Sequence, residues 1–275
     1  MFTLNCRGKL LQIGPPVVMG IINATPDSFY KGNINDDILL LAEKMVTEGA
    51  SILDIGGQST RPGSERIPAS TEMERVIPVI RKIHERFPAT VISADTYYSE
   101  VAAAAIDAGA SVINDISAGN MDKNMIAVVA KLGTPYICMH MKGTPETMQQ
   151  NIVYDDVVKE VLDFFIKKIA ECREAGIHDI IIDPGFGFGK STAHNLKLLK
   201  ELEVFGMLDR PILAGLSRKG TVYKTLNISA AEALNGTTVL NTLALHNGAS
   251  VLRVHDVKEA KEAITLMEAY KQFGN

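Results

Sequence analysis

Short apolar runs alternate with longer amphipathic stretches along nearly the whole chain. The runs are rich in Val, Ile and Leu, which is typical of strands buried on both faces of a parallel sheet. Eight strands are predicted, at residues 17–22, 51–55, 90–94, 111–113, 135–139, 180–182, 211–215 and 250–254. A helix is predicted after each strand, at residues 36–48, 70–87, 99–107, 122–131, 154–175, 193–203, 230–246 and 257–270.

Strict alternation of strand and helix predicts a parallel sheet, and eight such units over about 250 residues fit a (β/α)8 TIM barrel. An open, doubly wound sheet is the alternative. Residues 2–13 predict a short N-terminal β-hairpin, since apolar residues flank a turn at Arg7-Gly8-Lys9. Ser70-Thr71 before Glu72 is a capping signal for the second helix. Without a linker or a low-complexity segment, residues 1–275 are predicted to form a single domain.

The composition narrows the class of protein. It is 46% hydrophobic and 22% charged, as in ordinary globular proteins, and the net charge of −4 argues against nucleic-acid binding. No run approaches the roughly 20 apolar residues of a membrane-spanning helix, and the first residues lack the layout of a signal peptide. The three cysteines show no metal-binding spacing. We therefore expect reduced thiols and a cytoplasmic location, with no membrane partner.

The most distinctive stretch runs from Ile180 through Asp183 to Lys190, with glycines at 185, 187 and 189. It is not a P-loop, because the first glycine of that motif would fall on Pro184. It is not a dinucleotide fingerprint, because the third glycine would fall on Lys190. The glycines allow close approach of the backbone to a flat or bulky group. Taken alone, a tight turn with a buried capping Asp183 explains the stretch equally well.

Polar side chains follow nearly every predicted strand. They are Asn23, Asp54, Asp95, Asn114, His140, Asp183, Ser217 with Lys219, and Arg253 with His255. In a (β/α)8 barrel the carboxyl ends of all strands face one bowl, where active sites lie. Each residue alone has a structural explanation: an Asp can cap the next helix, and a lone His140 is more often a packed histidine than a ligand. Eight strand ends together favour an active site.

These residues fall into two chemical sets. Asp95, Asn114 and Asp183 offer carboxylates and an amide, which suit a planar heterocycle with an amino group beside a ring N–H. Such a ring could lie against apolar neighbours, namely Ile116, Met139 and Phe188.

The second set is cationic or donating and suits phosphate. It contains Arg61, Lys219, Arg253 and His255, with the hydroxyls of Ser59 and Thr60. Asn23 offers an amide oxygen that could hold Mg²⁺ beside phosphates. No His/Cys cluster for zinc and no Ser-His-Asp arrangement is recognisable. The loops at 24–35 and 57–69 are longer than usual and are predicted to close over a substrate, with mobile surface as the alternative.

Motifs at these strand ends resemble the dihydropteroate synthase family in order along essentially the whole chain. They are Asn23-Ala24-Thr25-Pro26-Asp27-Ser28-Phe29, Gly56-Gly57-Gln58-Ser59-Thr60-Arg61-Pro62-Gly63, Asp95-Thr96, Asn114-Asp115, Met139-His140-Met141, the 183–190 stretch, Gly215-Leu216-Ser217-Arg218-Lys219 and Arg253-Val254-His255-Asp256. The departures are Gln58 for the usual Glu, Ala94 for Ile or Val, and Gly220 for Ser. None of these removes a residue assigned to chemistry.

The resemblance implies condensation of 6-hydroxymethyl-7,8-dihydropterin pyrophosphate with p-aminobenzoate, which gives 7,8-dihydropteroate and pyrophosphate. It implies a pterin site at Asp95, Asn114, Asp183 and Lys219, with Met139 and Phe188 on its wall. It implies a site for pyrophosphate and Mg²⁺ at Asn23, Thr60, Arg253 and His255, and a p-aminobenzoate site at Phe29, Arg61, Pro62, Ser217 and Lys219. The catalytic set would be Asp95, Lys219, Arg253 and His255. Sulfonamide inhibition and a homodimer are further implications.

Two alternatives remain at this point. A methyltetrahydrofolate-binding domain of corrinoid methyltransferases resembles this family in barrel and pterin pocket, but it has no use for the phosphate-binding set or for the loop with Thr60 and Arg61. A non-catalytic pterin-binding protein should have lost residues of the catalytic set, and none is missing. Lys190, in contrast, is predicted not to bind phosphate.

Overall fold

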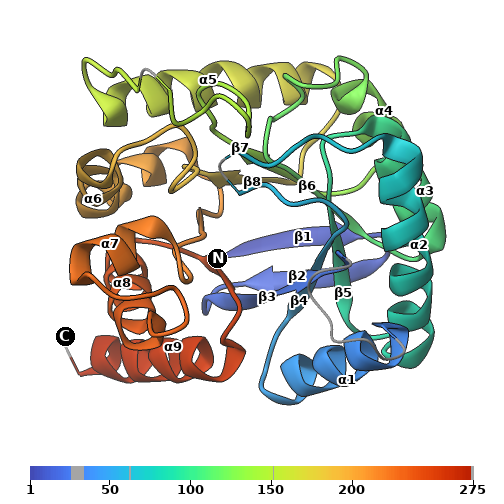
Figure 1. Ribbon diagram of the computed structural model, residues 1–275, viewed down its shortest axis with the longest axis horizontal. Coiled ribbons are helices and arrows are strands. Elements are labelled where there is room, and N and C mark those ends of the chain that lie inside the picture. Colours follow the sequence, from blue (N-terminus) through green and yellow to red (C-terminus); the bar gives the residue numbers. More distant parts are fainter. Residues whose placement is uncertain (26–33, 62, 151, 274–275) are drawn as a thin grey trace.

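In the computed structural model, eight parallel strands form a barrel that helices surround (Figure 1). The structure describes residues 1–25, 34–61, 63–150 and 152–273, with only the backbone at 34–36. The strands pair in the order β8-β7-β6-β5-β4-β3-β10-β9, and a parallel bridge between Ile182 and Ile212 closes β8 onto β9. The prediction of a (β/α)8 barrel is confirmed, and the open-sheet alternative is wrong.

The elements follow the predicted order closely. The barrel strands are β3 (Val17–Asn23), β4 (Ile52–Gly56), β5 (Val91–Asp95), β6 (Val112–Asp115), β7 (Tyr136–Met139), β8 (Ile180–Asp183), β9 (Leu213–Ala214) and β10 (Val251–Val254). The helices are α1 (Ile34–Thr47), α2 (Ala69–Arg86), α3 (Ser99–Ala108), α4 (Met125–Leu132), α5 (Val157–Glu174), α6 (Thr192–Lys200), α7 (Gly220–Leu226), α8 (Leu234–His246) and α9 (Val257–Gln272). A 3-10 helix, Leu202–Leu208, follows α6.

The predicted hairpin is confirmed as β1 (Phe2–Cys6) and β2 (Lys9–Ile13), which pair antiparallel. Its inner face buries Leu4, Cys6, Leu11 and Ile13. These side chains share one apolar cluster with inward-facing residues near the amino ends of the barrel strands, including Ile52, Val112, Ile181 and Val251. The hairpin therefore covers the amino end of the barrel, and the carboxyl end remains as the place for a bowl.

The barrel interior changes from apolar to polar over two residues along each of four strands. Side chains two residues apart point to the same face of a strand. The pairs Ile52 and Asp54, Val112 and Asn114, Ile181 and Asp183, and Val251 and Arg253 each combine a residue of the apolar cluster with a polar residue nearer the carboxyl end. The polar bowl therefore rests directly on a packed apolar layer.

The predicted helix at 230–246 is wrong at its beginning. The chain forms the short α7, ends it at Asn227 with a left-handed φ of 54°, and begins α8 only at Leu234. Between the two helices, residues 228–233 make hydrogen bonds that are not helical: Ser229 bonds to the Glu232 side chain, and the Arg218 guanidinium binds the Ala230 carbonyl. These bonds compete with helical ones.

The predicted cap of α2 by Ser70-Thr71 is also wrong. The helix begins after Pro68 without a side-chain cap. The Glu72 side chain turns inward instead, where one oxygen accepts a hydrogen bond from Gln58 Nε2 at 3.1 Å. Burial raises the Glu72 pKa to about 7.

Two further expectations concern the environment of the chain. Cys6, Cys138 and Cys172 are all buried and free. Within the described residues, no helix combines the length and the apolar character needed to cross a membrane.

Candidate active site

A hydrogen-bonded cluster joins four strand ends at the carboxyl mouth of the barrel, called the bowl below. Arg253 on β10 donates from Nε to Asp54 Oδ2 on β4 and from Nη2 to Asp95 Oδ2 on β5, both at 2.6 Å. Asn114 on β6 donates from Nδ2 to the same Asp54 oxygen at 3.0 Å. The structure thus brings together Asp95, Asn114 and Arg253, as predicted from the sequence.

Asp54 is the site residue that the sequence reasoning missed. It appears among the strand ends, but it has no role in the predicted site. Its side chain is fully buried, and it holds both Arg253 and Asn114, while its Oδ1 has no hydrogen-bond partner in the described structure. A carboxylate within the apolar run of 52–55 was the available signal, because a buried charge needs a partner.

Charge in this cluster is finely balanced. Burial raises the pKa of Asp95 to about 7; the Arg253 charge opposes this shift, and Asp54 adds to it. Burial disfavours the charged form of Arg253, but Asp54 and Asp95 together raise its pKa above the ordinary value. Arg253 therefore stays cationic, and Asp95 is the carboxylate whose charge can change near neutral pH.

On the β5–β8 side of the bowl, Asp183 and Lys219 form the next pair of charges. Asp183 Oδ1 accepts a hydrogen bond from the Gly185 amide at 2.7 Å. Lys219 Nζ donates to the Phe186 carbonyl at 2.7 Å and lies 4.7 Å from the centre of the Phe188 ring. Burial lowers the pKa of Lys219 to about 8, although Asp183 opposes the shift. The Lys219 cation therefore lies at the aromatic face, near enough to Asp183 for the two charges to act on each other.

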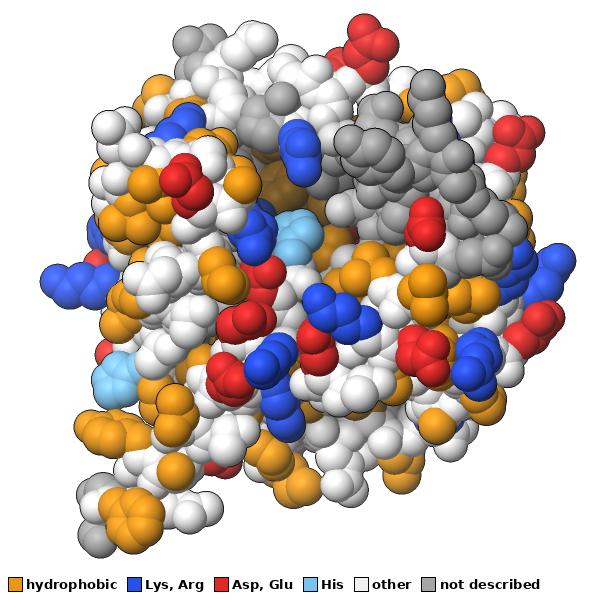
Figure 2. Space-filling model, turned by 60° about the horizontal axis from the view of Figure 1, so that its bottom comes forward, with side chains coloured by type: hydrophobic (Ala, Val, Ile, Leu, Met, Phe, Trp, Pro, Cys, Tyr) orange, Lys and Arg blue, Asp and Glu red, His pale blue; other side chains and the backbone are white. Residues whose placement is uncertain are grey.

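A small apolar cluster lies on the same side. Ile116, Met139 and Phe188, predicted as neighbours of a flat ring, are buried together with Tyr97 and Met148, apart from the main core. Figure 2 shows a face with a hollow whose bottom is hydrophobic and whose edge carries Lys or Arg and His side chains. An apolar wall beside acceptor groups suits a planar, polar heterocycle.

The alternating glycines serve the packing of one loop against another. Gly185 and Gly189 have φ of +70° and +64°, a region that favours glycine. A Cβ at Gly185 would lie 1.9 Å from the His140 carbonyl oxygen, and one at Gly189 would lie 2.4 Å from that of Lys142. The sequence predicted a close approach to a flat or bulky group; in the structure Gly185 and Gly189 instead approach the backbone after β7, in the turn that carries Phe188.

Lys190 stabilises this turn by donating hydrogen bonds to its backbone carbonyls. It is 3% exposed, and its Nζ lies within 2.9–3.2 Å of four groups. These are His140 Nδ1 and the carbonyl oxygens of His140, Gly185 and Phe188. Burial lowers the pKa of Lys190 to about 7 and, with the Lys190 charge, that of His140 to about 2. His140 is therefore packed, as its structural explanation has it, and the Lys190 amine is engaged by protein groups.

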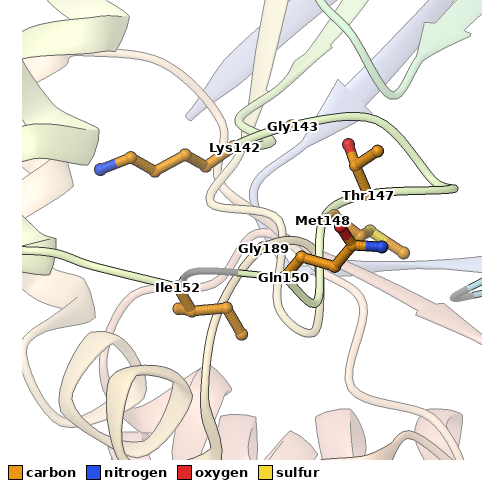
Figure 3. Close-up of a pocket in the computed structure, with 7 residues that line it drawn as sticks. All are labelled: Lys142, Gly143, Thr147, Met148, Gln150, Ile152 and Gly189. Atoms are coloured by element: carbon orange, nitrogen blue, oxygen red, sulfur yellow. The ribbon is translucent and has the colours of Figure 1, made fainter.

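A cavity of about 200 Å³ lies beyond the same turn (Figure 3). Its lining consists of Lys142, Gly143, Thr147, Met148, Gln150, Ile152 and Gly189. The Lys142 amine points away from the other lining side chains and bonds to Glu160 at 3.0 Å and to the Val153 carbonyl at 2.6 Å. Among the described residues, none of the predicted site residues lines this cavity, and Lys142, the only charged side chain in its described lining, is engaged elsewhere.

On the β9–β10 side, His255 stands at the rim. Its Nδ1 lies 3.0 Å from Ser217 Oγ, and its backbone N–H donates to the same Oγ at 3.2 Å. Burial first, and then the Arg253 charge, lower the pKa of His255. Because the residue as a whole is exposed, water screens part of this effect, and the imidazole is neutral near pH 7 either way.

The remaining predicted residues come from loops. Thr60 is half-buried and Arg61 is exposed, and neither side chain bonds to Arg253 or His255 in the described structure. Arg61 is near enough for its charge to lower the His255 pKa. Phe29 and Pro62 lie outside the described residues.

Asn23 is the predicted contact for Mg²⁺, at the end of β3. In the described part of the chain, no group of three or more His, Cys, Asp or Glu side chains could hold a metal ion. A single amide oxygen does not make a metal cage. It does fit Mg²⁺ that arrives on phosphate oxygens, because this ion keeps most of its water and takes few protein ligands.

Comparisons with known proteins agree with this geometry. Residues 19–255 match the model of a family described as pterin binding enzyme. Dihydropteroate synthase of Escherichia coli (strain K12) is 42% identical over 271 residues, which cover 97% of this chain and 95% of that one.

Solved structures are similarly close. Xanthomonas albilineans dihydropteroate synthase with 4-aminobenzoic acid has a TM-score of 0.92 at 40% identity and covers 98% of both chains. Yersinia pestis dihydropteroate synthase in a sulfonamide drug complex has a TM-score of 0.94 at 39% identity, over 98% of this chain and 100% of that one. Sequence, fold and site all lead to one conclusion: this chain belongs to the dihydropteroate synthase family of pterin-binding enzymes.

Proposed function

We propose that this chain joins 6-hydroxymethyl-7,8-dihydropterin pyrophosphate to p-aminobenzoate, which gives 7,8-dihydropteroate and pyrophosphate. The observation that carries the proposal is the Arg253 cluster beside the apolar wall of Ile116, Met139 and Phe188. One bowl thus offers acceptors for a heterocycle and a fixed cation for a phosphate. The corrinoid methyltransferase alternative needs no such cation.

The pterin binds on the β5–β8 side in this proposal. Asp183 uses one carboxylate oxygen on the Gly185 amide, and its other oxygen can accept from the amino group and ring N–H of the pterin. Asp95 and Asn114 contact the opposite edge of the ring. Lys219 and Phe188 face each other at 4.7 Å and border the same space.

The pyrophosphate binds toward β10. Arg253 donates from Nε to Asp54 and from Nη2 to Asp95, so Nη1 remains to donate to a phosphate oxygen. His255 and Thr60 add donors. Asn23 would hold Mg²⁺, and that ion, when bound, supplies positive charge that stabilises the leaving pyrophosphate.

The substitution proceeds by a dissociative route in this proposal. The bond between the exocyclic methylene carbon and the pyrophosphate oxygen breaks, and the oxygen keeps the electron pair. The cation left on the methylene is shared with the pterin ring, and ionised Asp95 stabilises it. The lone pair of the arylamine then forms the C–N bond, and the amine nitrogen loses one proton to the released pyrophosphate or to water. A pterin trapped covalently on a side chain, in a half-reaction without p-aminobenzoate, would contradict this route.

The p-aminobenzoate site is proposed beside the loops after β3 and β4, with Phe29, Arg61, Pro62, Ser217 and Lys219. Sulfonamides would compete there, since the Xanthomonas relative is described with 4-aminobenzoic acid and the Yersinia relative with a sulfonamide drug. Competition between a sulfonamide and p-aminobenzoate in steady-state kinetics tests this assignment; inhibition independent of p-aminobenzoate would refute it.

A homodimer and a cytoplasmic location complete the proposal. Exposed apolar side chains occur on α7, α8 and α9, which lie together on one side of the barrel in Figure 1. They are Leu226, Val239, Leu243, Leu266 and Tyr270. Their burial against a second copy would remove apolar surface from water. Sedimentation or light scattering measures the mass, and a monomer at micromolar concentration would contradict the dimer. The three free cysteines suit a reducing compartment.

One assay tests the function as a whole. Pyrophosphate release should require the pterin substrate, p-aminobenzoate and Mg²⁺ together. A folded chain that binds the pterin but releases no pyrophosphate would restore the non-catalytic alternative. Transfer of a methyl group from methyltetrahydrofolate to a corrinoid protein would restore the methyltransferase alternative.

A further inference from the structure

The loop after β9 and the end of β10 are joined by two adjacent side-chain contacts, called the β9–β10 latch below. Ser217 Oγ contacts His255, and Arg218 forms two 2.9 Å hydrogen bonds with Asp256, from Nε and from Nη2. Consecutive residues of one segment are thus paired with consecutive residues of the other. The latch determines how the His255 ring is presented to the bowl.

The Ser217 hydroxyl has only one way to satisfy all its hydrogen bonds. The His255 backbone N–H can only donate, so Ser217 Oγ is its acceptor at 3.2 Å. Ser217 is 4% exposed, and no other described residue accepts its hydroxyl proton. A buried donor without an acceptor is costly. The hydroxyl proton is satisfied if it is donated to His255 Nδ1, 3.0 Å away.

A histidine that accepts at Nδ1 carries its proton on Nε2 when it is neutral. We propose that Ser217 is a positioning residue that holds His255 in the Nε2–H tautomer, so that the imidazole donates a hydrogen bond to the departing pyrophosphate. This role rests on the proposed function. The opposite tautomer would direct a lone pair toward an anion and would leave the Ser217 proton without a partner.

The second contact of the latch, between Arg218 and Asp256, keeps the Asp256 carboxylate away from His255 Nδ1. A carboxylate at Nδ1 would favour the Nδ1–H tautomer, as in Ser-His-Asp triads. Asp256 adjoins His255 in sequence, but Arg218 takes both of its oxygens. Arg218 has a left-handed φ of 53°, and its amide bonds to Thr237 Oγ1 at 3.0 Å, so the loop is fixed. Ser217 and His255 therefore lack the third, orienting carboxylate of a Ser-His-Asp triad.

The tautomer can be measured directly on the whole, ligand-free chain. Two-bond ¹⁵N–¹H correlation spectra of protein labelled in histidine nitrogens distinguish the two tautomers, and His255→Gln identifies the His255 signals. We expect the Nε2–H pattern in the native chain and a mixture of tautomers in Ser217→Ala. Ser111→Ala is the matched control, because Ser111 is buried at the opposite, amino end of β6, and it should keep the native pattern. An Nδ1–H pattern in the native chain overturns the proposal.

The functional consequence needs a second measurement. Ser217→Ala should weaken binding of inorganic pyrophosphate with Mg²⁺ by about 2- to 10-fold, the usual effect of one hydrogen bond. The affinity for the pterin alone should not change. A changed tautomer with unchanged pyrophosphate affinity would refute the role in leaving-group binding. If the tautomer is as expected but the native chain releases no pyrophosphate from its substrates, the proposed function fails instead.

Discussion

The two sides of the bowl are built in different ways. The β5–β8 side consists of residues at strand ends: Asn114 and Asp183 are 4% and 5% exposed, and Met139 is buried beside them. The β9–β10 side depends on the rim, where His255 is exposed, and on the loop with Thr60 and Arg61. The first side is formed before any ligand binds. On the second side, neither the Thr60 nor the Arg61 side chain bonds to Arg253 or His255 in the described, ligand-free structure.

Arg253 belongs to both sides, so its removal should have the largest effect. Arg253→Ala removes the fixed cation for pyrophosphate and leaves two buried carboxylates, Asp54 and Asp95, without it. We expect kcat to fall by about 10²- to 10³-fold, as for other lost transition-state donors. Stability should fall by roughly 3–5 kcal/mol, the usual cost of breaking a buried pair.

Steady-state kinetics and urea unfolding measure these two effects of Arg253→Ala. Arg253→Lys is the matched variant: it keeps a charge but loses the two-sided fork, so it should recover stability more than activity. Unchanged pyrophosphate binding in Arg253→Ala would remove Arg253 from the phosphate site.

Asp183→Ala should weaken pterin binding far more than pyrophosphate binding, and so distinguish the two sides of the bowl. It removes the acceptor proposed for the amino group and ring N–H of the pterin, and one charged pair of hydrogen bonds corresponds to about 10- to 100-fold in affinity. Pyrophosphate affinity should change much less, because in the described residues Asp183 makes no hydrogen bond or ion pair with Arg253 or His255, and only its charge acts on Arg253. Calorimetry with each ligand alone makes the test. Equal losses for both ligands would mean that the bowl responds as one unit, and unchanged pterin affinity would exclude the assigned role.

Lys190→Met tests whether the β5–β8 side of the bowl needs the hydrogen bonds that Lys190 donates to the 185–188 turn and to His140. The change removes the Lys190 donor from three carbonyl groups, those of His140, Gly185 and Phe188, of which the Gly185 carbonyl keeps a second donor, the Phe188 N–H. We expect a loss of about 1–3 kcal/mol in stability and a several-fold higher KM for the pterin, with the KM for p-aminobenzoate unchanged. Lys168→Met is the control, since Lys168 is also buried but bonds to Glu171 on α5. A pterin KM that rises equally in both variants would show a general loss of stability.

The sequence predicted the strand-borne side better than the latch. A run such as 180–182 followed by Asp183 shows both the strand and the residue at its end, since period and position determine where the side chain points. Ser217 and His255 lie far apart in the sequence, and their contact depends on β9 meeting β10, which no local pattern shows. Asp54 was missed for a similar reason: its partners, Asn114 and Arg253, come from distant strands.

The smallest predicted effect is a dependence on pH that acts in opposite directions on pterin binding and on pyrophosphate binding. The Asp95 pKa is raised to about 7, so this carboxyl gains a proton as the pH falls from 8 to 6. A protonated Asp95 accepts the pterin N–H less well and gives the methylene cation less support. Pterin affinity should therefore fall a few-fold over this range, whereas pyrophosphate affinity should rise, because a neutral Asp95 no longer offsets the Arg253 charge. Calorimetric titrations at several pH values measure both, and Asp95→Asn, which cannot titrate, should give a flat pterin curve. If that variant keeps the native pH dependence, another group is responsible, and Lys219, which borders the pterin space and has a pKa lowered to about 8, is the next residue to replace.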